Sequence, residues 1–249
     1  SYRDTVPLTM QTFILIVVGQ IISMLGSTMT TFALGLWAWE RTGQATTFSL
    51  ATLFGFAPTV FLCPVAGALV DRWNRKLVMM LSDLAAALAT AALLTLYLTG
   101  RLRIWHLYAA NGFIGAFGAF QFPAFSAAIT TLVPKAQYAR ANGLMWLAGP
   151  TATIFGPILA ASLVGLIGVG GVMVVDLCTA AVALTVLISR HVPQPENPEP
   201  RDVGNRHLFK DMVYGFRYIF ERPSLLGLQL VFFAKNAFSI RSSSSYLRP

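Results

Sequence analysis

The sequence predicts an all-α membrane protein: a six-helix transmembrane bundle, followed by a cytoplasmic loop and a partial seventh helix. Charged residues make up only 11% of the 249 residues, and hydrophobic residues make up 55%. Mean hydropathy is +0.64, whereas ordinary globular domains have about 25% charged residues. The uncharged runs 5–39, 42–70, 104–134 and 141–175 each exceed the ~20 residues that cross a bilayer. No soluble core requires apolar segments of this length.

The individual spans follow from cutting these runs at charges, Gly/Pro clusters and polar turns. Residues 141–189 contain a single charge, Asp176, yet they are twice as long as one span. This run must therefore fold back on itself, and the glycine-rich stretch 165–171 is the expected turn. The expected spans are 12–37, 45–70, 77–99, 104–128, 141–165 and 170–190.

Lysine and arginine are distributed unevenly between the two sides of this bundle. If the N-terminus is cytoplasmic, the inner segments up to residue 222 carry twelve of them and the outer loops carry three. Cytoplasmic loops are enriched in Lys and Arg. We therefore expect a multi-pass protein of the cell (inner or plasma) membrane with a cytoplasmic N-terminus. The same placement in loops argues against a nucleic-acid partner, despite the net charge of +8.

The chain changes character after the sixth span. Four prolines between residues 193 and 200 predict an extended linker, and apolar residues at helical spacing over 208–220 predict an amphipathic helix on the inner membrane surface. A seventh apolar stretch is short for a span and is interrupted by Lys235 and Asn236. Three parts are expected: the bundle at 1–190, the cytoplasmic linker with its helix at 191–223, and an incomplete seventh span and tail at 224–249.

Polar and small residues recur at helical spacing on four of the expected spans. These stripes are Gln20, Ser23, Ser27 and Thr31; Ser49, Thr52, Thr59 and Cys63; Asn111, Gly115, Gly118 and Gln121; and Asn142, Gly149, Thr153 and Gly156. Each stripe could simply pack against a neighbouring helix, but amides facing hydrocarbon are costly, which favours a polar cavity. The residues expected to line a substrate cavity are Gln20, Met24, Ser27, Asn111, Gln121 and Trp146.

Proline pairs occupy the middle helix of each expected three-helix unit. Pro58 and Pro64 lie in the second span, and the fifth span carries the elements Gly149, Pro150, Gly156 and Pro157. Helices loosened at corresponding positions of two inverted repeats are typical of the moving parts and binding sites of transporters. Chance is the alternative, since proline is common in membrane helices.

The turn between the second and third spans is rich in charge. Gly67 permits close helix approach, Asp71 can accept from exposed N–H groups at a helix start, and Arg72 and Arg75 can donate to carboxylates or to helix C-termini. The segment is either a cytoplasmic gate that latches two helix bundles together or a solvated basic loop.

Asp83 and Asp176 are the acids inside the expected spans. An intramembrane carboxyl group is a candidate proton carrier, and it can also be structural. We expect Asp83 to pair with Arg72, Arg75 or Arg140 near the cytoplasmic side. Asp176 lies in the first turns of the sixth span, where the helix dipole favours an anion.

The charged turn at 67–76 resembles the signature loop of the major facilitator superfamily, Gly-x-x-x-Asp-Arg, with Asn74 where many members have glycine. Further stretches are similar to its drug-exporting branch, which contains macrolide-efflux and enterobactin-exporter proteins. They are 19–27, 40–43, 132–134, 140–144 and Asp176. The resemblance implies two six-helix halves, each built of inverted three-helix repeats, with this chain as the first and a missing C-terminal half as its partner. It also implies proton antiport, although 156–161 has alanines where exporters often have paired glycines.

Few residues of the sequence support the hypothesis that the protein is an enzyme. The three histidines are isolated, no cluster has metal-ligand spacing, and a phosphate-binding loop is missing, so we expect no enzyme, no cofactor and no metal. The expected function is secondary active transport that exports amphipathic small molecules or drugs by proton antiport with alternating access. Its partners are then a small-molecule substrate, protons and the lipid bilayer. The alternative is a non-transporting truncated half, or a membrane sensor or binding protein of the same fold.

Overall fold

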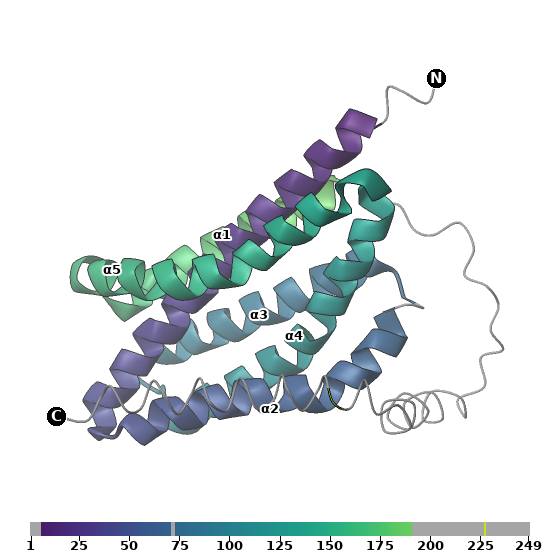
Figure 1. The fold of residues 1–249 in the computed structure, drawn as a ribbon. Coiled ribbons are helices and arrows are strands. Elements are labelled where there is room, and N and C mark those ends of the chain that lie inside the picture. Colours follow the sequence, from purple (N-terminus) through teal and green to yellow (C-terminus); the bar gives the residue numbers. More distant parts are fainter. Residues whose placement is uncertain (1–5, 71–72, 191–226, 228–249) are drawn as a thin grey trace. The chain divides into compact units, whose positions relative to one another are not determined.

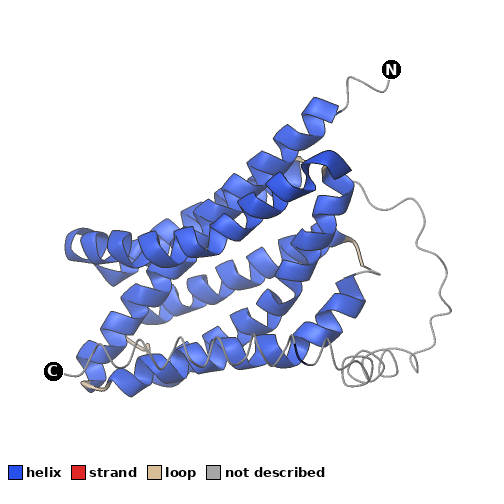
Figure 2. Cartoon of the chain, viewed as in Figure 1, coloured by secondary structure: helices blue, strands red, loops and turns tan. Residues whose placement is uncertain are grey.

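The computed structural model describes residues 6–70, 73–190 and 227, and all regular elements of these residues are helical (Figures 1 and 2). Five helices in this part of the chain are long and apolar enough to cross a membrane. The linker at 191–223, the seventh stretch except residue 227, and both Asp71 and Arg72 lie outside the described residues. The elements are α1 (Val6–Thr42), α2 (Ala45–Val70), α3 (Arg75–Leu98), α4 (Ile104–Leu132), the short 3-10 helix η1 (Lys135–Gln137) and α5 (Tyr138–Ser189).

α5 consists of two arms joined at Gly168. This residue has φ 69° and ψ 175°, a conformation that side chains with a Cβ rarely adopt and that glycine tolerates. Figure 1 shows the teal first arm running to this point and the green second arm returning beside it. The turn predicted within 165–171 is therefore found at Gly168, and the stretches 141–165 and 170–190 lie in different arms.

Short, specific turns separate the other helices. Gly43 and Gly100 adopt positive φ after α1 and α3. Asn74 caps the start of α3, because its side-chain oxygen accepts a hydrogen bond from the backbone N–H of Leu77 at 3.2 Å. An asparagine cap satisfies one of the free N–H groups of a first helical turn, which gives Asn74 a structural role at the position where the resembling loops have glycine.

The helices pack closely where small residues face each other. α1 contacts both arms of α5, α2 contacts α4, and α3 contacts α4 and α5. A Cβ at Gly156 would lie 2.7 Å from Cγ2 of Thr28 on α1, and one at Gly115 of α4 would overlap the carbonyl oxygen of Gly55 on α2. Without a hydrophobic driving force between helices in lipid, such close backbone approach is a main source of helix association.

Two apolar clusters form the core of the described helices, and a layer of polar residues lies between them. One cluster surrounds Phe13 and Met79, and the other surrounds Leu34 and Met173. The polar layer consists of buried or half-buried residues on α1, α3, α4 and the second arm of α5. They are Gln20, Ser23, Ser27, Thr30, Asp83, Thr90, Gln121 and Asp176.

Candidate functional site

The first centre of the polar layer is a network of two glutamines around Asp83. Nε2 of Gln20 on α1 donates to Oδ2 of Asp83 on α3 at 2.7 Å. Nε2 of Gln121 on α4 donates to Oδ1 of the same carboxylate at 2.6 Å and to Oε1 of Gln20 at 3.0 Å. Asp83 is only 6% exposed. Three helices are thus joined at one buried acid.

The partners of Asp83 differ from those expected. Both carboxylate oxygens accept from amides, and Arg75 points elsewhere. Its Nη1 donates to the carbonyl oxygen of Ala127 at 2.7 Å and lies 3.4 Å from Oγ1 of Thr130. Among the described residues, Asp83 pairs with neither Arg75 nor Arg140, and Arg72 lies outside them. Arg75 begins α3, whereas Asp83 lies eight residues further along the helix, roughly 12 Å away at 1.5 Å per residue.

A cavity of about 470 Å³ opens beside this network. It brings together four of the six predicted cavity residues, namely Gln20, Met24, Gln121 and Trp146. Gly149 and Pro150 from the fifth-span element also line it. The complete lining is Val17, Gln20, Met24, Gly118, Gln121, Phe122, Phe125, Met145, Trp146, Ala148, Gly149 and Pro150.

The walls of this cavity are mainly apolar and aromatic. The rings of Phe122 and Trp146 pack edge to face, with centroids 5.9 Å apart and an interplanar angle of 65°. Sequence reasoning missed Phe122, Phe125 and Met145, although Phe125 lies one helical turn after Gln121. An apolar cavity with a few convergent polar groups is typical of small-molecule sites.

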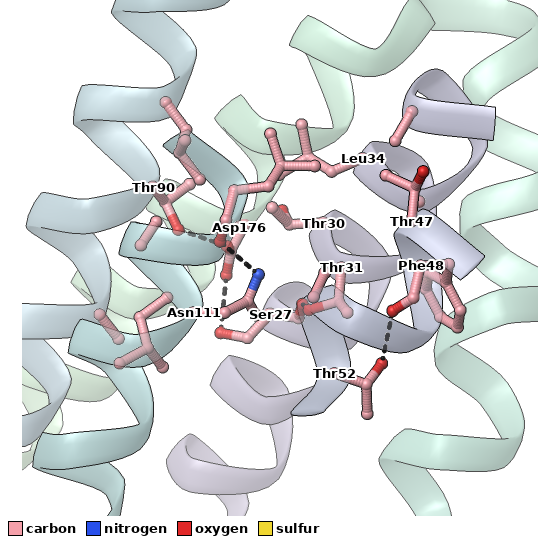
Figure 3. A pocket seen from close by; sticks show the side chains of 18 residues that line it. Ser27, Thr30, Thr31, Leu34, Thr47, Phe48, Thr52, Thr90, Asn111 and Asp176 are labelled. Carbon is pink, nitrogen blue, oxygen red and sulfur yellow. Dashed lines mark hydrogen bonds between the residues drawn. The ribbon is translucent and has the colours of Figure 1, made fainter. Parts of the chain in front are cut away.

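The remaining two predicted cavity residues, Ser27 and Asn111, line a separate pocket of about 90 Å³ that ends at Asp176 (Figure 3). Oγ of Ser27 donates to Oδ1 of Asp176 at 3.1 Å, and Oγ1 of Thr90 donates to Oδ2 at 3.1 Å. Nδ2 of Asn111 donates to the backbone oxygen of Leu107 on its own helix at 2.8 Å. The predicted single cavity is therefore two pockets, each next to a buried carboxylate.

The second proline element of α5 packs rather than lines either pocket. Gly156 is buried against Thr28 of α1, and Pro157 follows it half-buried. Of the two glycine–proline pairs in the fifth span, the one at Gly149 and Pro150 contacts the larger cavity and the one at Gly156 and Pro157 lies against α1.

The described part of the charged turn holds helix ends together. Besides the contact of Arg75 with α4, Nζ of Lys76 donates to the carbonyl oxygens of Ile188 at 2.9 Å and Arg190 at 2.7 Å, at the end of α5. Cations stabilise helix C-termini in this way. A Cβ at Gly67 would meet nothing within 4 Å among the described residues. This role of Lys76 was not predicted, because in the sequence alone Lys76 is one of several basic residues of the loop.

Comparisons with known proteins agree with this architecture. Residues 16–247 match the sequence model of the Major Facilitator Superfamily. Over 215 residues the chain is 29% identical to macrolide efflux protein A of Streptococcus pyogenes, a match that covers 86% of the chain and 52% of the relative. It is 26% identical over 217 residues to the uncharacterized MFS-type transporter YkuC of Bacillus subtilis, covering 85% of the chain and 50% of the relative.

A third relative is the multidrug efflux pump Tap of Mycolicibacterium fortuitum. It is 26% identical over 209 residues, covering 77% of this chain and 48% of the pump. The chain spans about half the length of the curated relatives it matches.

Proposed function

The chain belongs to the major facilitator superfamily, and from this we propose that it forms the N-terminal half of a secondary exporter of amphipathic small molecules, driven by proton antiport. Membership of this family indicates that the chain is part of a multi-pass membrane transporter. The observation that carries the finer proposal is the cavity of about 470 Å³ whose two polar wall residues, Gln20 and Gln121, both bind Asp83.

The proposed topology has six spans and a cytoplasmic N-terminus in the plasma (inner) membrane. α5 then crosses twice, with Gly168 at the outer turn. The turn geometry at Gly168 and the excess of Lys and Arg on one side support this arrangement. α1–α3 and α4 with both arms of α5 form the two inverted repeats, and a second half of the same fold closes the open side of the cavity.

The cavity walls favour a substrate with a broad apolar surface and a few polar groups. Phe122 and Trp146 offer ring faces and edges to aromatic or cationic molecules. The amides of Gln20 and Gln121, which lie next to each other in the cavity wall, offer the substrate a hydrogen-bond donor and an acceptor. The names of the efflux relatives are consistent with such a substrate.

Asp83 is the proposed proton-linked acid. When ionised, its two oxygens accept the hydrogen bonds from Gln20 and Gln121. When protonated, one oxygen carries a donor, so one amide must turn to another acceptor. Because both amides face the cavity, proton binding at Asp83 changes the polar groups that are offered to the substrate. This coupling gives the exchange of proton for substrate a structural basis.

The cytoplasmic gate is proposed at Gly67, Asp71, Arg72 and Arg75. In the described part, Arg75 is already bound to the end of α4, which fixes the base of this turn. A Cβ at Gly67 would contact none of the described residues, and this face of α2 is the proposed surface against which a helix of the second half closes.

The test is proton-driven efflux of a lipophilic cationic dye, ethidium, from vesicles that contain the full-length transporter. We expect Asp83→Asn to abolish efflux driven by a pH gradient while dye binding persists, whereas Asp83→Glu keeps part of the coupling. Normal pH-driven efflux in Asp83→Asn would refute the assignment of Asp83. Dye binding without flux in the unaltered protein would support the alternative of a sensor or binding protein.

A further inference from the structure

We infer that the pocket at Asp176 is a binding site for one sodium ion, separate from the substrate cavity. The pocket lies between α1, α2, α3 and α4 and ends at the second arm of α5 (Figure 3). This inference concerns a different carboxylate from the proposed proton site. It does not rest on the proposed function, because ion binding can be measured without transport.

The walls of this pocket supply oxygen atoms from several helices. Hydroxyl groups come from α1, α2 and α3, and Asn111 supplies an amide from α4. The polar lining residues are Ser27, Thr30, Thr31, Thr47, Thr52, Thr90, Asn111 and Asp176. Hard cations prefer oxygen ligands of this kind. A volume of about 90 Å³ leaves room for a small ion together with a few waters.

The charge of an ionised Asp176 favours a cation in this pocket. Asp176 is 3% exposed, and none of the residues that line the pocket is basic. Its hydrogen-bond partners Ser27 and Thr90 are neutral. An ionised carboxylate buried without a counter-charge is very unfavourable. A single carboxylate balances one positive charge, which favours a monovalent ion over Mg²⁺ or Ca²⁺.

Thr30 provides the observation that points to a ligand beyond the protein itself. Its side chain is 5% exposed and lines the pocket beside Asp176. Its hydroxyl group nevertheless makes no hydrogen bond of acceptable geometry with this or any other described residue. Buried polar atoms are almost always satisfied by a protein group, a water or an ion. Ser27, Thr90 and Thr30 thus surround the carboxylate with three hydroxyl oxygens, one of which is left for the ion.

Gly26 makes this convergence possible. A Cβ at this position would lie 3.0 Å from Oδ1 of Asp176 and would overlap Oγ1 of Thr179. Only a residue without a side chain lets α1 approach α5 so closely that hydroxyls of α1 reach the carboxylate.

The sodium site is stacked above the Asp83 network on the same helix faces. Ser27 follows Gln20 by seven residues on α1, and Thr90 follows Asp83 by seven residues on α3. Seven residues correspond to two turns and about 10 Å of rise. Sodium therefore stabilises the contacts of α1, α3 and α5 about two helical turns away from the substrate cavity.

The test is the thermal unfolding midpoint of the full-length protein in detergent, with choline chloride replaced stepwise by NaCl at constant ionic strength. We expect a saturable rise of the midpoint with Na⁺ in the unaltered protein and none in Asp176→Asn. Thr30→Val should raise the half-saturating Na⁺ concentration by about tenfold, the size of loss seen when a metal site loses supporting contacts. Thr95→Val, on α3 with its hydroxyl bound to Ala91, is the matched control and should respond like the unaltered protein.

Three results would overturn the assignment. The first is an equal rise in choline chloride, and the second is a full Na⁺ response in Asp176→Asn. The third is a response that follows pH instead of Na⁺ and is lost in Asp176→Asn, which would identify a proton as the occupant. If Asp176→Asn does not fold, an unchanged half-saturating concentration in both Thr30→Val and Ser27→Ala refutes the proposal.

Discussion

Replacing Gly115 by alanine should separate α2 from α4. The added Cβ would overlap the backbone carbonyl of Gly55, and a backbone atom cannot move aside as a flexible side chain can. The helices must therefore move apart locally. This shift also stretches the hydrogen bond from Oγ1 of Thr59 to the carbonyl oxygen of Gly115, which is 2.8 Å long.

The cost has two parts. Overpacking of a close helix contact costs about 1–3 kcal/mol, and loss of one hydrogen bond between helices costs about 0.5–1.5 kcal/mol. Alanine favours helix over glycine by about 1 kcal/mol, so the free energy of unfolding should fall by roughly 1–3 kcal/mol in total.

The matched control is Gly112→Ala, one turn earlier on α4. There the new Cβ would lie 3.7 Å from the carbonyl oxygen of Phe54, an ordinary contact. We expect this variant to be as stable as the unaltered protein or slightly more stable. Denaturant unfolding of both variants in the same detergent, followed by helical circular dichroism, measures the difference. Equal unfolding free energies for Gly115→Ala and Gly112→Ala would show that the close contact between Gly115 and the backbone of Gly55 does not limit the packing of α2 on α4.

Further predictions concern the topology, a helix clamp and the cavity. Single cysteines at Asn74 and Lys135 should be labelled from the cytoplasm and one at Gly168 from outside, measured with an impermeant maleimide in intact cells and inverted vesicles. Lys76→Met should lower the free energy of unfolding by about 1 kcal/mol through loss of two carbonyl contacts at the end of α5, measured by denaturant titration. Trp146→Ala should weaken ethidium binding by about tenfold, because an aromatic contact is worth about 0.5–1.5 kcal/mol beyond its buried area, measured by fluorescence titration.

Each of these predictions has its own control. The labelling requires a background without Cys63 and Cys178, since both are exposed, and the reverse labelling pattern would refute the proposed orientation. Lys76→Arg should retain most of the stability, and an unchanged Lys76→Met would show that the carbonyl contacts are replaced by water. Trp146→Phe should bind ethidium nearly as well as the unaltered protein. If alanine binds equally well, the aromatic wall does not contact the dye.

The helices could be predicted from the sequence because hydrophobic length is a property of one segment at a time. The turn at Gly168 was predictable for the same reason, since an uncharged run twice the length of a span must reverse. α1 extends beyond the expected 12–37, from Val6 to Thr42, because a helix continues into polar flanks that a hydropathy criterion excludes.

The site was harder to predict, because periodicity gives the face of one helix and not its partners. Gln20 and Ser27 lie on one face of α1, so one cavity was expected, yet they bond to different carboxylates. The partners of Asp83 lie 63 and 38 residues away in the chain. Helix rotation and depth, which set these contacts, are decided by packing at glycines such as Gly26, and that packing has no signature in a single sequence.

The pairing of helices has a mechanical consequence. α1 packs mainly on α5 and α2 mainly on α4, whereas the direct contacts of α1 with α2 and of α4 with α5 are few. The described helices thus form two pairs, α1 with α5 and α2 with α4, and α3 contacts one member of each pair. Asp83 on α3 holds Gln20 from one pair and Gln121 from the other. Sliding of one helix pair past the other must lengthen at least one of these hydrogen bonds. The carboxylate therefore resists this motion, and its resistance depends on how many hydrogen bonds it accepts.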